Sequence, residues 1–389
     1  MKYYIIAGEA SGDLHGSNLI KELFHLDKEA KIRCWGGDMM KEAGAEVVKH
    51  YRDLAFMGFI EVIRNLPTIL KNLKFCKQDI QQFTPEVIIL IDYPGFYLRI
   101  AKWAKEAGFK VIYYISPQVW AWKENRVKLI KKAVDKMLVI LPFEKAFYET
   151  KWNYPVVYVG HPLVEVIKKF SKEIQDLITL RTSANNEVLN QQVPQEKPRD
   201  IIALLPGSRK QEIKIKLPIM LEASKRFPGY RFVIAQAPGL SHLFYNEMIL
   251  PYPNVDLAIT GQTYSLLNHA KAALVTSGTA TLETALFGVP QVVCYKGSAI
   301  SYQIAKRLVK IKYISLVNLI MGKMVVKELI QNDLTVENLA KELNDVLHNE
   351  HRIALVKADY NSLKNLLQKD GNASQKAAQE ITIFLQYST

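Results

Sequence analysis

The stretch LLPGSRKQE at residues 204–212 combines a flexible loop, a guanidinium group and the start of a helix. Apolar residues run into Pro206, Gly207 and Ser208, Arg209 follows at once, and helix-forming residues come next. A helix N-terminus binds anions because its unpaired backbone N–H groups and its dipole both favour negative charge. Arg209 adds planar donors that suit a phosphate group. The stretch therefore indicates an anion site, although an ordinary strand-to-helix turn with a solvated arginine explains it equally well in isolation.

A second loop of this kind lies in TSGTATLETALFG at residues 276–288, where a predicted strand ends and a small polar turn leads into a helix. Its backbone N–H groups and hydroxyls suit a second phosphate group. We place Glu283 in the first turn of that helix, where a carboxylate suits ribose hydroxyls or simply stabilises the helix. Two such loops in one domain favour a nucleotide with a diphosphate. We expect it to contact Gly207, Ser208, Arg209, Ser277, Gly278, Thr279, Ala280, Thr281 and Glu283.

Asp92 comes directly after the apolar run Val87–Ile91 and before Pro94 and Gly95, which we expect to form a turn. A carboxylate at a strand end can act as a general base towards a substrate hydroxyl. An Asx-turn cap is the structural alternative. Two other loops are rich in polar or aromatic groups: GEASGDLHG follows the first predicted strand, and SPQVWAW sets two tryptophans beside a proline. Such rings are most often core, but they also suit sugar or acyl contacts.

Several common cofactor and metal motifs are missing from the sequence. It contains no G-x-G-x-x-G and no P-loop, and the first loop instead spaces its glycines at Gly8, Gly12 and Gly16. Nicotinamide redox chemistry and ATP hydrolysis are therefore disfavoured. The sequence has no H-E-x-x-H motif, and its three cysteines lack metal-ligand spacing. We expect no cofactor, no metal and a reducing cytoplasmic compartment.

The elements that position these loops are predicted by an alternation of apolar runs and helical patterns. A chain of 389 residues, 49% hydrophobic and 23% charged, should fold into about two or three domains. Strand–helix repetition of this kind predicts parallel sheets covered on both faces. The predicted strands are 3–7, 87–91, 111–115, 137–141 and 156–159 in the first half, and 201–205, 231–235, 255–259, 272–276 and 291–295 in the second.

The formal net charge of +13 favours an anionic partner, and nucleic acid, an anionic membrane and a phosphorylated small molecule all qualify. The basic clusters at 123–132 and 306–312 lack the aromatic and glycine pattern of a nucleic-acid module, so we expect no nucleic acid. No apolar run reaches the ~18 residues of a membrane-spanning helix. The apolar stretch before Glu9 is too short for a signal peptide.

Six motifs occur in one order along the chain: GEASGD, IDYPGF, SPQVWAW, VGHPL, LLPGSRKQE and SGTATLE. Together they resemble the lipid-A-disaccharide synthases, which are glycosyltransferases of the GT-B fold, and the resemblance extends from the first strand to about Gln331. It implies an α/β fold of two Rossmann-like domains whose parallel sheets face a central cleft. It also implies transfer of diacylglucosamine from UDP-2,3-diacylglucosamine to 2,3-diacylglucosamine 1-phosphate (lipid X), with inversion, a β-1,6 linkage and release of UDP. The family is metal-independent.

The resemblance implies that Asp92 is the essential carboxylate and that Arg209 serves the nucleotide side. UDP gains negative charge as the glycosidic bond breaks, so Arg209 and the helix N-termini would stabilise the transition state more than the ground state. On the other side of the reaction, the acceptor is assigned to polar and aromatic residues of the N-terminal half. These are Glu9, Ser11, Gly12, Asp13, His15, Trp120 and His161.

Asn318 and Gln331 match two later family motifs and are also assigned to the nucleotide pocket, although Val317 and Lys327 stand where the family usually has prolines. Two other functions stay open. A UDP-sugar epimerase of the same fold would share both phosphate loops, but it needs no apolar surface for acyl chains. A basic membrane- or RNA-binding protein would gain nothing from the two carboxylates beside the predicted substrates.

The resemblance and the composition together divide the chain into four parts. The segment 171–200 is polar and rich in Asn, Gln and Pro, which is typical of a linker with at most a short helix. We expect an acceptor- and lipid-binding domain at 1–170 and a UDP-sugar-binding domain at 201–345. The C-terminal helices at 346–389 could pack back on the first domain.

A stripe of apolar residues with basic residues between them occupies 54–75. At helical spacing such a stripe is normally core. Pro67 interrupts the helix, however, and acylated substrates need accessible apolar surface, so we expect this segment to contact acyl chains and an anionic membrane. We place the protein in the cytoplasm, peripherally attached to the inner face of the cytoplasmic membrane, and leave its oligomeric state open, a homodimer included. The residues assigned to the contact are Phe56, Phe59, Ile60, Ile63 and Leu66.

Overall fold

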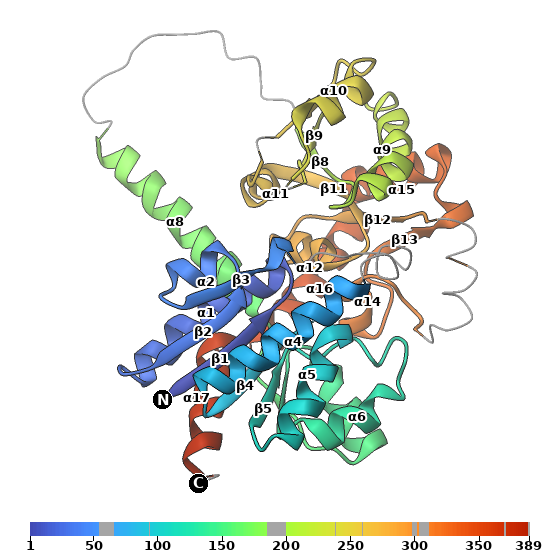
Figure 1. Cartoon of the computed structure of the whole chain (residues 1–389). Coiled ribbons are helices and arrows are strands. Elements are labelled where there is room, and N and C mark those ends of the chain that lie inside the picture. The colour runs from blue at the N-terminus through green and yellow to red at the C-terminus, as the bar shows by residue number, and fades with distance from the viewer. Residues whose placement is uncertain are drawn as a thin grey trace. The chain divides into compact units, whose positions relative to one another are not determined.

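The computed structural model describes residues 1–53, 66–92, 94–184, 200–237, 239–258, 260–297, 302, 311–368 and 371–387. The chain forms two compact units, the first made of Met1–Pro162 and Leu367–Thr389 and the second of Leu163–Leu366. Each unit contains one parallel β-sheet with helices packed against it (Figure 1). The predicted pair of parallel-sheet α/β domains is confirmed.

The sheet of the first unit has seven strands in the order β3-β2-β1-β4-β5-β6-β7. β1 lies inside the sheet and pairs in parallel with β2 on one side and β4 on the other. Most residues in the strands of this sheet have buried apolar side chains, which is the pattern of a sheet covered on both faces. The strands are β1 Lys2–Ala7, β2 Lys31–Gly36, β3 Glu46–His50, β4 Val87–Ile91, β5 Lys110–Tyr114, β6 Lys136–Val139 and β7 Val157–Tyr158.

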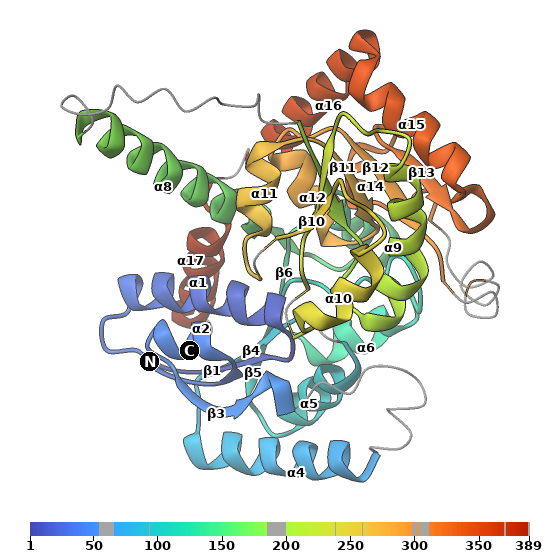
Figure 2. The same cartoon turned by 90° about the horizontal axis from the view of Figure 1, so that it is seen from above.

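Helices cover both faces of this sheet, and Figure 2 shows α1 (Ala10–Leu26) on one face and α4 (Leu66–Phe83) on the other. Apolar residues of α4 form one core cluster with those of α5 and with Tyr4 and Ile6 of β1. The other face of β1 is covered by α1, whose Leu19 and Leu23 are buried. The further helices are α2 Asp38–Glu42, α5 Pro94–Glu106, α6 Arg126–Ala133, α7 Pro142–Ala146, the 3-10 turn η1 Tyr51–Asp53 and the π-turn η2 Phe147–Lys151.

The last helix, α17 (Ala373–Tyr387), belongs to the first unit and packs against α1. Lys136 of β6 holds it, because its Nζ lies 2.6 Å from Glu380 Oε2 and donates to the Glu380 carbonyl at 2.9 Å. Gly160, whose φ of +92° favours glycine, packs beside Ala373 of this helix. Of the C-terminal helices described, this one is therefore part of the N-terminal fold.

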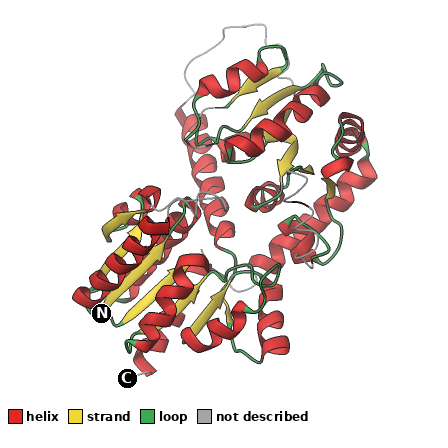
Figure 3. Cartoon of the chain, turned by 45° about the vertical axis from the view of Figure 1, so that its right-hand side comes forward, coloured by secondary structure: helices red, strands yellow, loops and turns green. Residues whose placement is uncertain are grey.

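The sheet of the second unit has six parallel strands in the order β10-β9-β8-β11-β12-β13. Helices and strands alternate along the chain in both units (Figure 3). β13 is not among the predicted strands, because Lys327 and Glu328 interrupt its apolar pattern; pairing with β12 defines it. The strands are β8 Ile201–Leu205, β9 Arg231–Ile234, β10 Val255–Leu257, β11 Ala270–Thr276, β12 Gln291–Tyr295 and β13 Lys327–Ile330.

Helices of the second unit connect these strands and continue past the sheet. The long helix α8 (Pro162–Ala184) belongs almost entirely to this unit, which begins at Leu163. Those that follow are α9 Lys210–Ser224, α10 His242–Ile249, α11 Thr263–His269, α12 Thr279–Leu286, α14 Leu316–Met321, the 3-10 turn η3 Gln331–Asp333, α15 Val336–His348 and α16 Glu350–Gln368.

Like β13, the strands β2 and β3 are not among the predicted strands. Two further elements differ from the sequence predictions. α8 spans Pro162–Ala184, so a long helix occupies the first part of the segment for which at most a short helix was expected. Just before this segment, the Phe170 ring lies 5.6 Å from that of Tyr264 and 5.9 Å from that of Phe287, and these contacts attach the helix to the second unit. The expected turn at Pro94 is instead the start of α5, a position that suits proline because its fixed φ is helical and its missing N–H needs no partner.

Candidate functional site

The two predicted anion loops line one pocket of about 510 Å³ in the second unit. They meet because β8 and β11 are neighbours in the sheet, so both loops leave its carboxyl edge side by side. The backbone at Gly207 has a φ of +118° and that at Gly278 a φ of +142°, conformations that glycine adopts readily. Of the predicted nucleotide contacts, the pocket is lined by Gly207, Ser208, Arg209, Ser277, Gly278, Thr279, Ala280 and Glu283.

Side chains fix the two loops to each other and to their surroundings. The Thr276 hydroxyl donates to the Pro206 carbonyl at 3.0 Å and so ties the end of β11 to the first loop. The Ser277 hydroxyl donates to the Ile314 carbonyl at 2.8 Å. Thr281 is fully buried and donates to the Gly278 carbonyl at 2.8 Å, so it shapes the turn and does not line the pocket.

Arg209 is the N-cap residue of α9, and its backbone is extended while its carbonyl accepts the first helical hydrogen bond from Ile213 N–H at 3.0 Å. Its side chain is 62% exposed, and its guanidinium Nη1 lies 3.6 Å from Glu212 Oε1. This guanidinium group and the helix N-terminus form the positive end of the pocket. Sequence reasoning identified Arg209 but not Glu212, which also lines the pocket.

Glu283 lines the pocket from the second turn of α12, because this helix begins at Thr279 and has no acidic residue in its first turn. The prediction of a first-turn carboxylate is therefore wrong. Tyr264 donates its hydroxyl to Glu283 Oε1 at 2.9 Å, and burial raises the pKa of the carboxyl group. A carboxylate fixed in this way can accept hydrogen bonds from a polyol such as ribose.

Asn318 and Gln331 are not among the residues that line this pocket. Asn318 is fully buried, and its amide binds the backbone of Val325 and Val326 and the carboxylate of Glu328, which fixes the connection between α14 and β13. Gln331 has a φ of +53°, and its Oε1 lies 3.4 Å from the N–H of Gly297, which donates to it. Both residues therefore shape the second unit in the described part of the chain.

In the first unit, Asp92 follows β4 at the carboxyl edge of the sheet. It has a φ of +56°, a left-handed conformation, and its N–H donates to the Tyr114 carbonyl while its own carbonyl accepts from the Tyr113 hydroxyl at 2.5 Å. Ile115, at the end of the neighbouring strand β5, has a φ of +65°, which is strained for a β-branched residue. Strained residues at adjacent strand ends are typical of functional sites.

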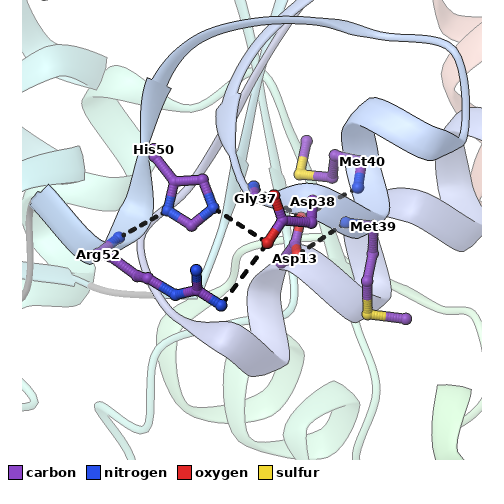
Figure 4. Close-up of polar contacts among 7 residues, drawn as sticks. All are labelled: Asp13, Gly37, Asp38, Met39, Met40, His50 and Arg52. Atoms are coloured by element: carbon purple, nitrogen blue, oxygen red, sulfur yellow. Dashed lines mark hydrogen bonds and ion pairs between the residues drawn. The ribbon is translucent and has the colours of Figure 1, made fainter. Parts of the chain in front are cut away.

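Asp13 has a structural role that the sequence did not reveal. Its buried carboxylate accepts hydrogen bonds from the backbone N–H groups of Gly37 at 2.7 Å, Met40 at 3.1 Å and Met39 at 3.2 Å (Figure 4). These donors belong to the N-terminus of α2, so Asp13 joins α1 to α2. Beside it, Asp38 Oδ2 lies 3.6 Å from both His50 Nε2 and Arg52 NH2.

The other predicted acceptor residues lie at the carboxyl ends of strands in the first unit. Ser11 is exposed and Glu9 half-buried at the start of α1, whereas a Cβ on Gly12 would lie 3.1 Å from the Cβ of Ala7, so Gly12 allows close packing. His15 and His161 are buried. Burial lowers the pKa of His15 to about 4, and burial with the nearby His15 lowers the pKa of His161 to about 3, so both rings are neutral at pH 7.

Glu144, which sequence reasoning missed, holds the predicted acceptor residue Trp120. The Trp120 indole N–H donates to Glu144 Oε1 at 3.1 Å, and the Leu141 N–H donates to Oε2 at 3.0 Å. Burial raises the pKa of the Glu144 carboxyl group to about 8. The sequence LPFEK does show a helix start with a glutamate at its third position, but only the fold reveals that this glutamate is buried.

The predicted acyl and membrane contacts Phe56, Phe59, Ile60 and Ile63 lie outside the described residues, and Leu66 is described only as the first residue of α4. Among the described helices, none has the length and apolar character needed to cross a membrane. In the same part of the chain, no group of His, Cys, Asp and Glu could hold a metal ion.

Comparison with known proteins identifies the family. The family model described as lipid-A-disaccharide synthetase matches residues 3–382. The lipid-A-disaccharide synthase of Geobacter metallireducens is 39% identical over 354 residues, which are 89% of this chain and 88% of that protein. The lipid-A-disaccharide synthase of Syntrophus aciditrophicus is 38% identical over 385 residues, which are 97% of each.

Solved structures resemble the whole chain. The glycotransferase of kitacinnamycin has a TM-score of 0.65 at 13% identity and 99% coverage of both chains. The UDP-GlcNAc 2-epimerase from Neisseria meningitidis has a TM-score of 0.64 at 12% identity and 100% coverage of both. At these identities the likeness establishes the fold alone, and it confirms the predicted GT-B class. Fold does not separate a transferase from an epimerase, but the family match does: this chain belongs to the lipid-A-disaccharide synthetase family, as its six motifs predicted.

Proposed function

We propose that this protein condenses UDP-2,3-diacylglucosamine with 2,3-diacylglucosamine 1-phosphate to form the lipid A disaccharide 1-phosphate and UDP. The observation that carries the proposal is the pocket at the carboxyl edge of the second sheet, where two glycine turns, two helix N-termini and Arg209 come together in a chain of this family. Such a pocket suits a diphosphate, and the carboxylate of Glu283 on its wall suits the ribose.

In this proposal, the second unit stabilises the leaving group. As the bond between the sugar and the β-phosphate breaks, negative charge grows on UDP. The N–H groups of the two glycine turns and the Arg209 guanidinium are aimed at that charge before the reaction, so they stabilise the transition state more than the ground state. No metal-ligand cluster occurs in the described residues, and these protein groups would neutralise the diphosphate.

Asp92 is the proposed general base. It would accept the proton of the acceptor's 6-hydroxyl while that oxygen attacks the anomeric carbon from the side opposite UDP, which inverts the configuration and gives a β-1,6 linkage. Its left-handed backbone, held by Tyr113 and Tyr114, supports this role because it fixes the direction of the side chain. Trp120, held by Glu144, is a proposed contact for the acceptor sugar.

We further propose that the protein works in the cytoplasm on the inner face of the cytoplasmic membrane. Both lipid substrates carry acyl chains, and a net charge of +13 attracts anionic lipids. The segment 54–75 is the proposed contact, with its apolar stripe and interspersed basic residues. A homodimer remains an expectation from the sequence.

The experiment is a coupled assay with the two lipid substrates, in which both the disaccharide and UDP are measured. Parent protein should release the two products in equal amounts, and Asp92→Asn should lose about 10²–10⁴ in kcat while still binding UDP. Disaccharide formation at the parent rate in the folded variant would remove Asp92 from the mechanism. A second assay supplies UDP-GlcNAc alone and tests for its epimerisation. If the sugar is epimerised and the lipid substrates give no disaccharide, the protein is an epimerase.

A further inference from the structure

Lys216 in α9 is a buried lysine directly behind the anion pocket. Its side chain is 2% exposed, and Nζ lies 3.5 Å from Glu212 Oε2, one helical turn earlier. Lysine is rarely buried, because removing an ammonium group from water is unfavourable unless an opposite charge accompanies it. Glu212 is that charge, and it is only partly buried, at 36% exposure.

Glu212 is an unexpected residue for a pocket that binds an anion. It lines the pocket, and its Oε2 lies 2.9 Å from the position that a Cβ on Gly207 would occupy, so the carboxylate sits against the first phosphate turn. Its other oxygen, Oε1, lies 3.6 Å from Arg209 NH1. One carboxylate therefore contacts two cations, Arg209 at the rim of the pocket and Lys216 behind its wall.

The charges of these three residues decide the field in the pocket. Arg209 and Glu212 alone would cancel, and a diphosphate would meet a neutral pair. With Lys216 the three positions carry a net charge of +1. Among the described residues, Cys294 and Tyr295 of β12 are titratable groups near Lys216 and Glu212, and burial raises the pKa of both, so they stay uncharged at pH 7. Burial lowers the pKa of Lys216, and Glu212 opposes that shift.

We propose that Lys216 is a buried counter-ion for Glu212, which lets Glu212 hold Arg209 at the rim of the pocket without repelling the nucleotide diphosphate. Lys216 does not line the pocket, so it acts through Glu212 and is a positioning residue. The inference rests on the proposed function, because it assumes that the pocket binds UDP. It adds a charge requirement that the two glycine loops alone do not imply.

Packing is the simpler explanation for a buried lysine, because its four methylenes can fill a core site. The two explanations differ in what happens when the charge is removed but the volume is kept. Lys216→Met retains an unbranched apolar side chain and leaves Glu212 uncompensated. If only packing matters, UDP affinity should not change, whereas the counter-ion role predicts weaker binding.

The test measures UDP binding by calorimetry for the parent, Lys216→Met, Glu212→Gln with Lys216→Met, and the control Lys214→Met, an exposed lysine on the same helix. At pH 8 the single variant should bind about tenfold or more weakly, equivalent to about 1.4 kcal/mol. The double variant restores the net charge of +1 but loses the ion pair between Glu212 and Arg209, so it should recover part of the tenfold loss and still bind more weakly than the parent. Lys214→Met loses the same formal charge at an exposed position and should stay within about twofold.

An ionic-strength series adds a readout that packing alone does not move. The weaker binding of Lys216→Met arises from repulsion between the diphosphate and Glu212, which is 36% exposed, so added salt should screen it. The ratio of the Kd of Lys216→Met to that of the parent should therefore fall as the salt concentration rises, and taking the ratio cancels the effect of salt on UDP itself.

Three results would overturn the inference. Parent-like binding by Lys216→Met would leave Lys216 with a packing role only. A double variant as weak as the single variant would show that the charge of Glu212 is not the cause. If Lys216→Met does not fold, the double variant is compared with the parent, and a loss of tenfold or more in the folded double variant overturns the inference. If the parent binds no UDP, the proposed function fails as well, which separates that outcome from the other two.

Discussion

Glu144 links the stability of the first unit to pH. Its side chain is 1% exposed, it accepts hydrogen bonds from Leu141 and Trp120, and burial raises its pKa from 4.5 to about 8. The folded state therefore keeps a proton that the unfolded state releases. The resulting stabilisation is complete below pH 4.5 and is lost as the pH rises through about 8. We expect Glu144→Gln, which resembles the protonated form, to remove this dependence.

The magnitude follows from proton linkage. Between about pH 5.5 and 7 the folded state should bind roughly one more proton at this site than the unfolded state, so the free energy of unfolding should fall by about 1.4 kcal/mol per pH unit. Over that window the loss is about 2 kcal/mol, or about 4–8 °C in Tm for a domain of this size. The amide nitrogen of glutamine cannot accept a hydrogen bond from the Leu141 N–H, so the substitution also changes the absolute stability of the unit. The test therefore compares how the free energy of unfolding changes with pH in each protein.

Tryptophan fluorescence in urea can isolate the first unit, because the five tryptophans of the chain all lie within Met1–Pro162. The parent, Glu144→Gln and a control, Glu42→Gln at an exposed position of α2, are unfolded at pH 5.5 and pH 7. His15 and His161 have lowered pKa values, so they contribute a slope of opposite sign. The difference between parent and variant cancels their contribution. If the parent and Glu144→Gln depend on pH in parallel, as the control should, the reasoning about Glu144 is refuted.

Four further predictions concern the other sites. Arg209→Ala should lower kcat/KM about 10–100-fold, because a charge-assisted phosphate contact is lost; unchanged steady-state kinetics would contradict this. Glu283→Ala should weaken UDP binding about 3–10-fold through the loss of a ribose hydrogen bond, as measured by calorimetry. A Kd equal to that of the parent would show that Glu283 does not contact the ribose. Asp13→Ala should lower the free energy of unfolding of the first unit by about 2–4 kcal/mol, since three backbone N–H groups lose a buried acceptor, and urea unfolding measures it. Replacing Phe59 and Ile63 with serine should reduce binding to anionic vesicles and raise KM for the lipids at unchanged Tm; a collapse of Tm with unchanged vesicle binding would assign both residues to the core.

Local patterns in the sequence determined much of the fold. Apolar runs with Val, Ile and Tyr predicted ten of the strands, because a sheet buried on both faces requires apolar residues at successive positions. Glycine and small polar residues between a strand and a helix predicted both anion loops, because the required backbone conformations and free N–H groups depend on a few consecutive residues. The strands β2, β3 and β13 were missed because charged residues interrupt their apolar patterns, and pairing with a neighbouring strand defines them.

Only the tertiary structure decided which polar side chains face a ligand and which hold the fold together. Asp13 and Asn318 look like good site residues in the sequence, and Glu144 does not stand out there. The structure shows that the first caps α2, the second fixes the α14–β13 connection and the third holds Trp120. Lys216 reads as one more basic residue on a helix until its burial beside Glu212 is known. Burial and contacts between segments distant in the sequence set these roles. The charge and pKa of a side chain depend on this three-dimensional environment more than on the neighbouring residues in the chain.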